Sequence, residues 1–243
     1  MSIEDDLRRV APAAPDADLL VAAWGTGAEG AGPATAARVA LRAGVPSAVA
    51  HHRLAVLQAR GDLQGSGRYR ELTAPGRRSA AAALRRARVV ECLLVDVLGL
   101  SWSEAADELS AWTASLSDEA VDAAFARLGR PARCPHGNPV EADRPWSGAS
   151  RLSGLAPGTT AVVDAVDDLP APAGSHHGAL QAAGVVPGAR LRLVGHEPDG
   201  TDLVEVGGTV VGLPRAAAGQ VRVRPVHPSG GGRGGSGRGG ARG

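Results

Sequence analysis

The most regular pattern of apolar and polar positions in the chain lies between residues 72 and 129. Apolar side chains recur there at spacings that form one stripe along a helix: Leu84, Val90, Leu94 and Leu98. Thr73 suits the N-cap of this helix, and neither glycine nor proline occurs from Arg77 to Leu98. The pattern therefore predicts a long helix over residues 74–98.

Two shorter helices are predicted after the long one. Ser101 and Glu104 have the Ser-x-x-Glu spacing of a capping box, which favours a helix over residues 101–112. Ser117 begins a further helix, which carries Val121 and Phe125 and ends at Gly129. Because aromatic residues are scarce and the stripes consist of Ala, Val and Leu, this segment is expected to be a set of packed helices.

The segment before residue 72 predicts a winged helix. Helical patterns cover residues 17–24, 34–43 and 48–60. Gly44 and Pro46 mark a tight turn between the last two helices, and Ser47 is expected to cap the third. The side chains expected to face the core are Val39, Leu41, Val49, Leu54 and Leu57. A β-hairpin with a glycine-rich turn is predicted over residues 63–72, and a helix-turn-helix followed by a hairpin is the pattern of a winged helix.

In such a module the third helix enters the major groove of double-stranded DNA and the wing touches its backbone. The residues expected to contact DNA from the start of this helix are Ser47, His51, His52 and Arg53. On the wing, Arg68 and Arg70 flank Tyr69 and are expected to contact phosphates. Two other interpretations stay open for His51 and His52, a pH-sensitive pair and a solvated helix face.

The C-terminal part predicts a small β domain. Short β patterns cover residues 160–166, 190–194, 203–206, 209–212 and 221–226, with a helix over 175–183. Residues 228–243 are rich in glycine and arginine and are predicted to be disordered. Such a tail either adds weak attraction to nucleic acid or serves only to keep the protein in solution.

Charge is distributed unevenly along the chain. All 26 basic residues are arginine, and the formal net charge is only +1. Residues 33–88 nevertheless contain eleven arginines against two acids, a net charge of +9, whereas residues 89–145 have a net charge of −6. The basic block favours a polyanionic partner. The absence of a long apolar run predicts a cytoplasmic protein without a membrane partner, and two cysteines predict no disulfide framework.

The segment from residue 72 to 139 resembles a known family. Its motifs are Leu72-Thr-x-x-Gly76-Arg77, Leu98-Gly-Leu100, Ser117-Asp-Glu119 and Cys134-Pro-His-Gly-Asn-Pro139. In order and spacing they resemble the linker and dimerisation region of the DtxR/MntR family of metal-dependent transcriptional repressors. The β patterns after residue 150 resemble the SH3-like FeoA domain that ends many of these repressors.

The resemblance implies a mainly α fold with a small β domain. It implies a winged helix DNA-binding domain (1–73), a helical dimerisation domain (74–143), a linker (144–157), an SH3-like FeoA-type β-barrel (158–227) and the tail (228–243). It further implies a homodimer, and we expect the interface to include Leu93, Val97 and Leu98.

Family members sense a divalent metal, Fe2+ or Mn2+, but most of the ligand positions are altered here. Those of one site fall on Asp18, Ser110, Thr113 and Ala114, and those of the other on Ala87, Glu91, Ala106, His176 and a position near Ala173. Only Asp18, Glu91 and His176 could coordinate, which leaves no complete ligand shell. The resemblance implies that Cys134 and His136 belong to an ordered turn. Only one residue separates them, and no second Cys/His cluster completes a zinc site.

The sequence thus predicts a sequence-specific DNA-binding regulator, a repressor whose metal sensing is lost or rebuilt, and not an enzyme. One alternative is a metal-gated repressor with ligands outside the aligned positions, such as His51, His136 or His176. Another is a dimeric interaction protein that has lost DNA binding. An enzyme is the last alternative, and Cys134 with His136 is its only candidate pair.

Overall fold

The computed structural model describes residues 16–28, 34–141, 149–167 and 176–226. The predicted disordered tail, the position near Ala173 and residues 144–148 of the expected linker lie outside the described residues. The fold class is as predicted, a mainly helical chain with a separate C-terminal domain built on a small antiparallel sheet. Among the described residues, none of the helices has the length and apolar character needed to cross a membrane.

The N-terminal unit is a helix-turn-helix with a wing. Its elements are α2 (Asp16–Ala28), β1 (Ala34–Thr35), α3 (Ala36–Ala43), α4 (Ser47–Arg60), β2 (Leu63–Gln64) and β3 (Tyr69–Leu72). The strands form an antiparallel sheet in the order β1-β3-β2. Gly44 has φ 65°, which glycine adopts without strain and which allows the tight turn between α3 and α4. The core of the unit includes Leu19, Leu20, Val39, Leu54, Leu57 and Leu63.

Several side-chain predictions in this unit were wrong. Leu41 is 72% exposed, whereas Val39 is fully buried. Residues two positions apart on a helix point in directions that differ by about 200° around its axis. Val39 and Leu41 therefore cannot both face one core. In α4 the buried residues are Ala50, Leu54 and Leu57, so the last two face the core as predicted, whereas Val49 is only half-buried. Ser47 is the first helical residue, and the N-cap position is occupied by proline without a side-chain hydrogen bond.

The central unit contains the three predicted helices, here α5 (Ala74–Cys92), α6 (Trp102–Ser115) and α7 (Asp118–Arg127), and η1 (Leu93–Val97). Thr73 and Ser117 accept hydrogen bonds from the third residue of their helices. Ser101 and Glu104 form both bonds of the capping box. The last turn of the long helix is a π-helix, η1, so α5 itself ends six residues before the predicted boundary at residue 98.

Gly76 explains why the first helical turn of α5 lies directly against the end of α4. A side chain at this position would collide with the backbone carbonyl of Asp62. The hydroxyl of Thr73 donates to the carbonyl of Gly61 at 2.6 Å. The two contacts fix the start of α5 on the winged unit.

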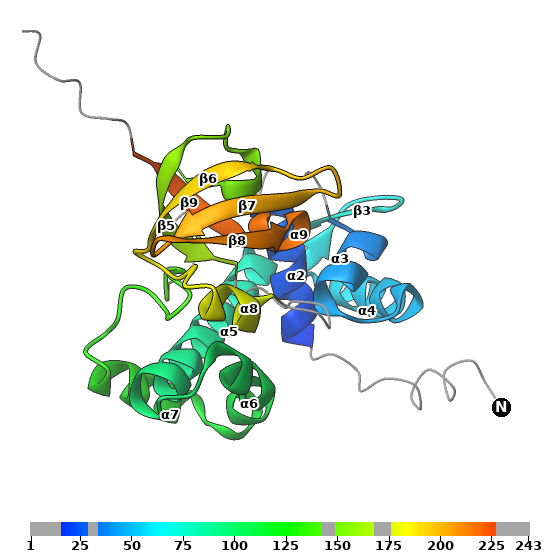
Figure 1. Cartoon of the computed structure of the whole chain (residues 1–243). Helices are drawn as coiled ribbons and strands as arrows, with labels where there is room; N and C mark the ends of the chain where they lie inside the picture. Colours follow the sequence, from blue (N-terminus) through cyan, green and yellow to red (C-terminus); the bar gives the residue numbers. More distant parts are fainter. Residues whose placement is uncertain (1–15, 29–33, 142–148, 168–175, 227–243) are drawn as a thin grey trace, which may run out of the picture.

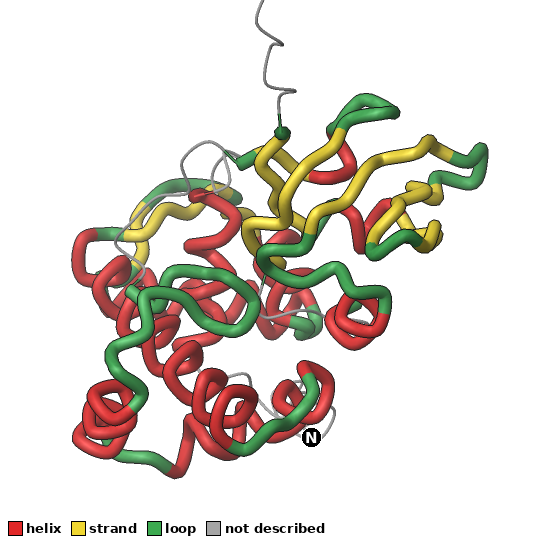
Figure 2. Tube along the Cα trace, turned by 60° about the vertical axis from the view of Figure 1, so that its left-hand side comes forward, coloured by secondary structure: helices red, strands yellow, loops and turns green. Residues whose placement is uncertain are grey.

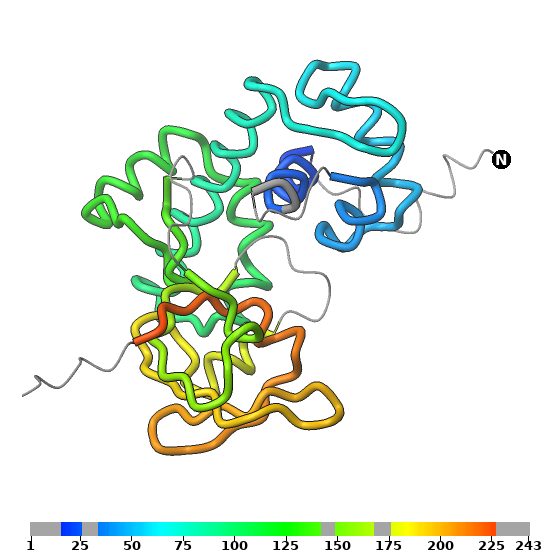
Figure 3. The backbone as a smooth tube through the Cα atoms, turned by 90° about the horizontal axis from the view of Figure 1, so that it is seen from above, coloured from blue at the N-terminus to red at the C-terminus, as the bar shows by residue number. Residues whose placement is uncertain are grey.

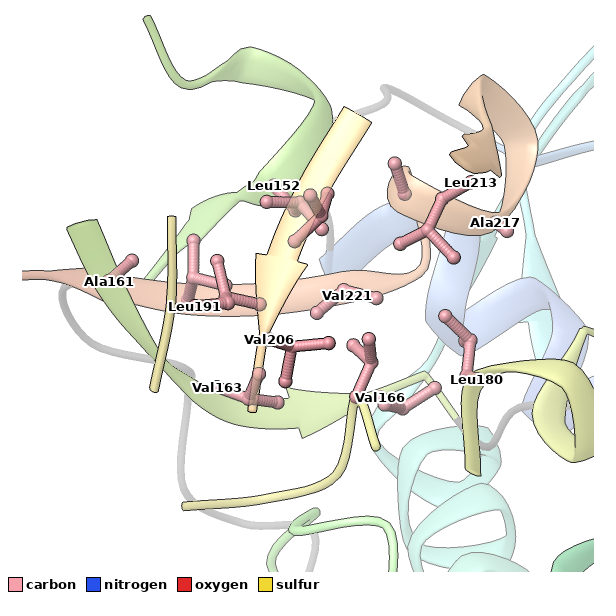
Figure 4. Close-up of a cluster of buried hydrophobic side chains, with 14 of the residues drawn as sticks. Leu152, Ala161, Val163, Val166, Leu180, Leu191, Val206, Leu213, Ala217 and Val221 are labelled. Atoms are coloured by element: carbon pink, nitrogen blue, oxygen red, sulfur yellow. The ribbon is translucent and has the colours of Figure 1, made fainter. Parts of the chain in front are cut away.

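The C-terminal domain is a small β-barrel. Its elements are β4 (Ser150–Arg151), η2 (Leu152–Gly154), β5 (Thr160–Val166), α8 (His177–Ala182), β6 (Arg190–His196), β7 (Thr201–Val206), β8 (Thr209–Pro214), α9 (Arg215–Ala218) and β9 (Val221–Pro225). The sheet order is β4-β9-β5-β6-β7-β8, with antiparallel neighbours throughout. Residues 150–151 lie in the range expected as a linker but pair with β9. Figure 4 shows Leu191, Val163, Val206 and Val221 pointing into a common apolar core, which alternation along the strands produces.

The three units contact one another through α5 and α6. In Figure 1 the winged unit with α2, α3 and α4 lies to the right of α5, the sheet lies above α5, and α6 and α7 lie below. The view from above in Figure 3 separates the winged unit from the C-terminal barrel, with the green helices to one side. The tube in Figure 2 likewise shows most of the strands gathered toward the upper right and most of the helices below and to the left of them. Trp102 of α6 belongs to the apolar core of the barrel, which joins these two units.

Candidate nucleic-acid interface and candidate metal centre

The exposed face of α4 carries most of the residues predicted to read DNA. Ser47, His51 and His52 are all exposed, as is Ala48. Their spacing of four residues places Ser47 with His51, and Ala48 with His52, on one side of the helix. Val56 continues this face and is 44% exposed, which offers an apolar contact of the kind that thymine methyl groups accept.

Arg53 lies differently from the other predicted base readers. Its Nη2 atom is 2.7 Å from Oδ1 of Asp16 in the first turn of α2. Arg60, two turns along α4, contacts the other oxygen of Asp16 at 3.1 Å and also pairs with Asp62. The two arginines therefore hold α2 against α4.

The wing brings its two arginines together around Tyr69. The guanidinium of Arg68 lies 5.2 Å from the centre of the Tyr69 ring and donates to its hydroxyl at 3.1 Å. Arg70 is half-buried and donates to the carbonyl of Gly67 at 2.6 Å, which shapes the turn of the wing. Gln58 of α4 donates to the carbonyl of Gly65 at 3.0 Å, so wing and helix form one surface.

Other arginines of the basic block are paired with the acidic block. Arg85 pairs with Asp122 at 2.8 Å and Arg86 with Asp118 at 2.7 Å, both on α7. The exposed arginines of the winged unit and the start of α5 are Arg38, Arg60, Arg68, Arg77 and Arg78, and of these Arg60 pairs with Asp16 and Asp62. The positive charge available to a polyanion is thus smaller than the sequence suggests.

The predicted dimer residues lie at and just after η1. Val97 is 59% exposed and Leu98 is 49% exposed, and Leu93 is half-buried. The amide of Leu98 donates to the carbonyl of Leu93 at 3.1 Å, five residues back, which widens the helix here. Two large apolar side chains exposed next to each other form a small patch that favours burial against another surface.

The first family metal site does not fit the residues that occupy its positions. Asp18 is half-buried, and this burial raises the pKa of its carboxyl above the usual 3.8. Ser110 and Ala114 are exposed, and the hydroxyl of Thr113 donates to the carbonyl of Leu109 at 2.8 Å. At this end of α6 the guanidinium of Arg86 donates to the carbonyls of Thr113 and Leu116. The positively charged side chain of Arg86 therefore occupies the end of α6, where the ligands of a metal ion would be needed.

The second family site is incomplete as well. Ala87 is half-buried and Ala106 is exposed, and neither offers a ligand atom. His176 is half-buried before the first turn of α8. Among the described residues of the second site, Glu91 is the one that belongs to a cluster of possible metal ligands. Its partners in that cluster lie outside the aligned positions.

That cluster consists of Glu91, Cys134 and His136. One ligand atom from each lies within 4.8 Å of the others, and the three residues are 6%, 4% and 3% exposed. Glu91 comes from the last turn of α5, and its Oε1 contacts Nδ1 of His136. The imidazole of His136 packs against the rings of Trp102 and His177, with centroid distances of 4.1 and 4.5 Å.

The sequence indicated Glu91 and, in one alternative, His136 as separate possible ligands, but it did not indicate that they meet, and Cys134 was expected only as part of a turn. The ordered turn is present: the amide of Gly137 donates to the carbonyl of Cys134 at 2.7 Å, and the amide of Cys134 to that of Asn138 at 2.8 Å. The missing partner, Glu91, is distant in the sequence. A spacing search for nearby Cys and His residues could not find it.

Comparisons with known proteins place these features in context. Residues 73–141 match the family described as "Iron dependent repressor, metal binding and dimerisation domain", and residues 150–225 match the FeoA domain. Iron-dependent repressor IdeR of Mycobacterium tuberculosis is 33% identical over 177 residues, which cover 65% of this chain and 74% of the relative. The diphtheria toxin repressor of Corynebacterium diphtheriae is 33% identical over 105 residues, 43% of this chain and 46% of the relative.

Solved structures agree with this result. A manganese-dependent transcriptional repressor in complex with manganese superposes with a TM-score of 0.75 at 29% identity, covering 87% of this chain and 100% of that chain. IdeR of T. acidophilum gives a TM-score of 0.71 at 22% identity over 89% of this chain and 100% of that chain, a similarity of fold.

Proposed function

The chain belongs to the DtxR/MntR family of metal-dependent transcriptional repressors, and on this premise we propose that it is a homodimeric repressor that binds a specific sequence of double-stranded DNA. It acts as a regulator and not as an enzyme. The observation that carries the proposal is the joint surface of α4 and the wing. This surface exposes Ser47, His51 and His52 on α4 and Arg68 on the wing.

Each part of this surface has a chemical role toward DNA. Serine and histidine side chains donate and accept hydrogen bonds at base edges, which supplies sequence preference. The guanidinium of Arg68 is positioned over Tyr69 at the wing, where a phosphate contact fixes orientation without reading sequence. Arg53 is proposed to act indirectly, because its pairing with Asp16 holds α2 against the reading helix.

Dimerisation is proposed through the exposed patch of Val97 and Leu98 with Leu93. One winged helix reads a short half-site, and a twofold dimer reads two half-sites with a fixed separation. The chain's match to a dimerisation domain family over residues 73–141 supports this assignment, since the patch lies within the match. A dimer of this kind binds an inverted repeat.

The proposal is tested by selecting bound duplexes from a random-sequence DNA library with the full-length protein. We expect an enriched inverted repeat whose half-sites are separated by about 10 base pairs or a multiple of it. Binding to the selected duplex is then measured by fluorescence anisotropy over a range of salt concentrations, and log K should fall linearly with log salt. A protein that enriches no sequence and shows no salt-dependent binding would instead be the dimeric interaction protein.

A further inference from the structure

We propose that Glu91, Cys134 and His136 bind one divalent transition-metal ion of the Zn2+ or Fe2+ class. Cys134 and His136 lie outside the two sets of aligned family positions. Glu91 belongs to the second of these sets. The inference concerns metal binding alone and does not depend on whether the chain binds DNA.

The three side chains supply the ligand atoms that such an ion prefers. Zinc binds thiolate sulfur at about 2.3 Å, imidazole nitrogen at about 2.0–2.1 Å and carboxylate oxygen at about 2.0–2.2 Å. Tetrahedral geometry then separates neighbouring ligand atoms by about 3.3–3.6 Å. The ligand atoms here already lie within 4.8 Å of one another, so small side-chain rotations bring them onto one ion. Three protein ligands leave a fourth position for water or another small ligand.

The electrostatics of the cluster favour a bound cation. Glu91, Cys134 and His136 are all nearly inaccessible to solvent, and Nε2 of His136 has no hydrogen-bond partner within the described residues. A buried carboxylate is stabilised by a neighbouring positive charge or hydrogen-bond donor, and a bound divalent ion would supply such a charge. A carboxylate, a thiolate and a neutral imidazole together carry a charge of −2, which a divalent ion neutralises.

The turn that carries two of the ligands is fixed from several sides. Gly137 has φ 84°, and a side chain there would collide with the backbone carbonyl of Asp164 in β5. The carbonyl of His136 accepts from the amide of Val166 at 2.8 Å. Arg88, one turn before Glu91 in α5, donates to the carbonyl of Pro139 at 2.6 Å. The backbone that carries the ligands is therefore held in position by protein contacts.

The second cysteine has a different environment and serves as the comparison. Cys92 packs with Cys134 in one apolar cluster, but it is not part of the ligand group. The thiol of Cys92 instead lies 4.0 Å from the carbonyl oxygen of Arg133.

The ligand set also selects among metals. Thiolate and imidazole favour Zn2+, Fe2+ and Co2+, whereas Mn2+ and Mg2+ prefer sites built from oxygen. The ion would join α5 to the turn of residues 134–139, and that turn is hydrogen-bonded to β5 of the barrel. Metal binding is therefore expected to stabilise the contact between the central unit and the barrel.

The experiment uses the full-length wild-type protein, freed of metal by chelation, and Co2+ as a spectroscopic probe. We expect one Co2+ per chain, with the near-ultraviolet charge-transfer absorption that a thiolate ligand produces and the visible bands of tetrahedral Co2+. Equimolar Zn2+ should remove both signals, whereas equimolar Mn2+ should leave them in place. Absence of the charge-transfer band in the wild-type protein would overturn the proposal without reference to any variant.

Two matched variants locate the thiolate. Cys134→Ala should abolish the charge-transfer band and weaken Co2+ binding by about a hundredfold or more, because loss of even an outer contact costs ten- to a hundredfold. Cys92→Ala makes the same change in the same apolar cluster and should leave the band unchanged. Circular dichroism of both metal-free variants checks that they are folded. A band that persists in folded Cys134→Ala, or is lost in folded Cys92→Ala, would overturn the assignment.

Discussion

The carboxylate of Asp16 in α2 lies 2.7 Å from the guanidinium of Arg53 in α4. Arg53 was the one arginine predicted to read bases. Its side chain is instead directed toward α2 by this pairing. Recognition would then depend on the shorter side chains of Ser47, His51 and His52, with Arg53 fixing the helix that carries them.

Asp16→Asn should release Arg53 toward DNA, whereas Arg60 keeps its pairing with Asp62. We expect tighter binding to any duplex and a salt slope steeper by about one, because each phosphate contact contributes about 0.9. The free energy of unfolding should fall by about 0.5–1 kcal/mol, since these pairs are partly exposed. Salt-dependent anisotropy and urea unfolding measure the two effects. Asp122→Asn makes the same charge change on α7 and should leave the salt slope unaltered.

Arg68→Ala tests the wing. Loss of one phosphate contact should weaken binding to specific and random duplexes alike and reduce the salt slope by about one. Arg127→Ala removes an equally exposed charge from α7 and is the control. A loss of affinity confined to the selected sequence would show that Arg68 reads bases and does not merely contact the backbone.

Val97→Asp tests the dimer patch. A charge at this exposed apolar position should not disturb the monomer but should prevent its burial against a second copy. Light scattering at micromolar concentration should give a monomer, and affinity for an inverted repeat should fall roughly a hundredfold. Val210→Asp, at an apolar residue of β8 that is 54% exposed, should remain dimeric. If both variants remain dimers, the interface lies elsewhere.

Asp18→Ala tests the first family metal site. Because Ser110, Thr113 and Ala114 supply no carboxylate, imidazole or thiolate, we expect DNA affinity with added Fe2+ or Mn2+ to stay within about twofold of wild type. Anisotropy with excess chelator and then with added metal measures this response. A tenfold metal effect that this substitution abolishes, about 1.4 kcal/mol of coupling, would mean that the family site still functions.

Glu104 makes the capping box of α6 sensitive to acid. Hydrogen bonds from Ser101 lower the pKa of this carboxyl below its usual 4.5. Glu104 therefore adds stability above pH 4.5, and this contribution is lost as pH falls through the lower folded-state value. Glu104→Gln should flatten the acid side of the stability–pH curve measured by urea unfolding. An unchanged curve would show that the box does not contribute in solution.

Much of the fold could be predicted from the sequence because its signals are local. Thr73, Ser101 and Ser117 cap the helices they were expected to cap, since each bonds to a backbone amide only three residues away. The exposure of Ser47, His51 and His52 follows from helical periodicity. The error at Leu41 was a local one too, because Val39 and Leu41, two positions apart on one helix, were assigned to the same face.

By itself, the sequence determined the order of the units, the helix boundaries set by caps, and the family. Only the tertiary structure decided which distant side chains meet. Packing of α2 on α4 brings Asp16 to Arg53, and packing of the turn of residues 134–139 on α5 brings Glu91 to Cys134 and His136. Such contacts depend on how whole elements are positioned, and no periodicity or spacing within one segment records that geometry.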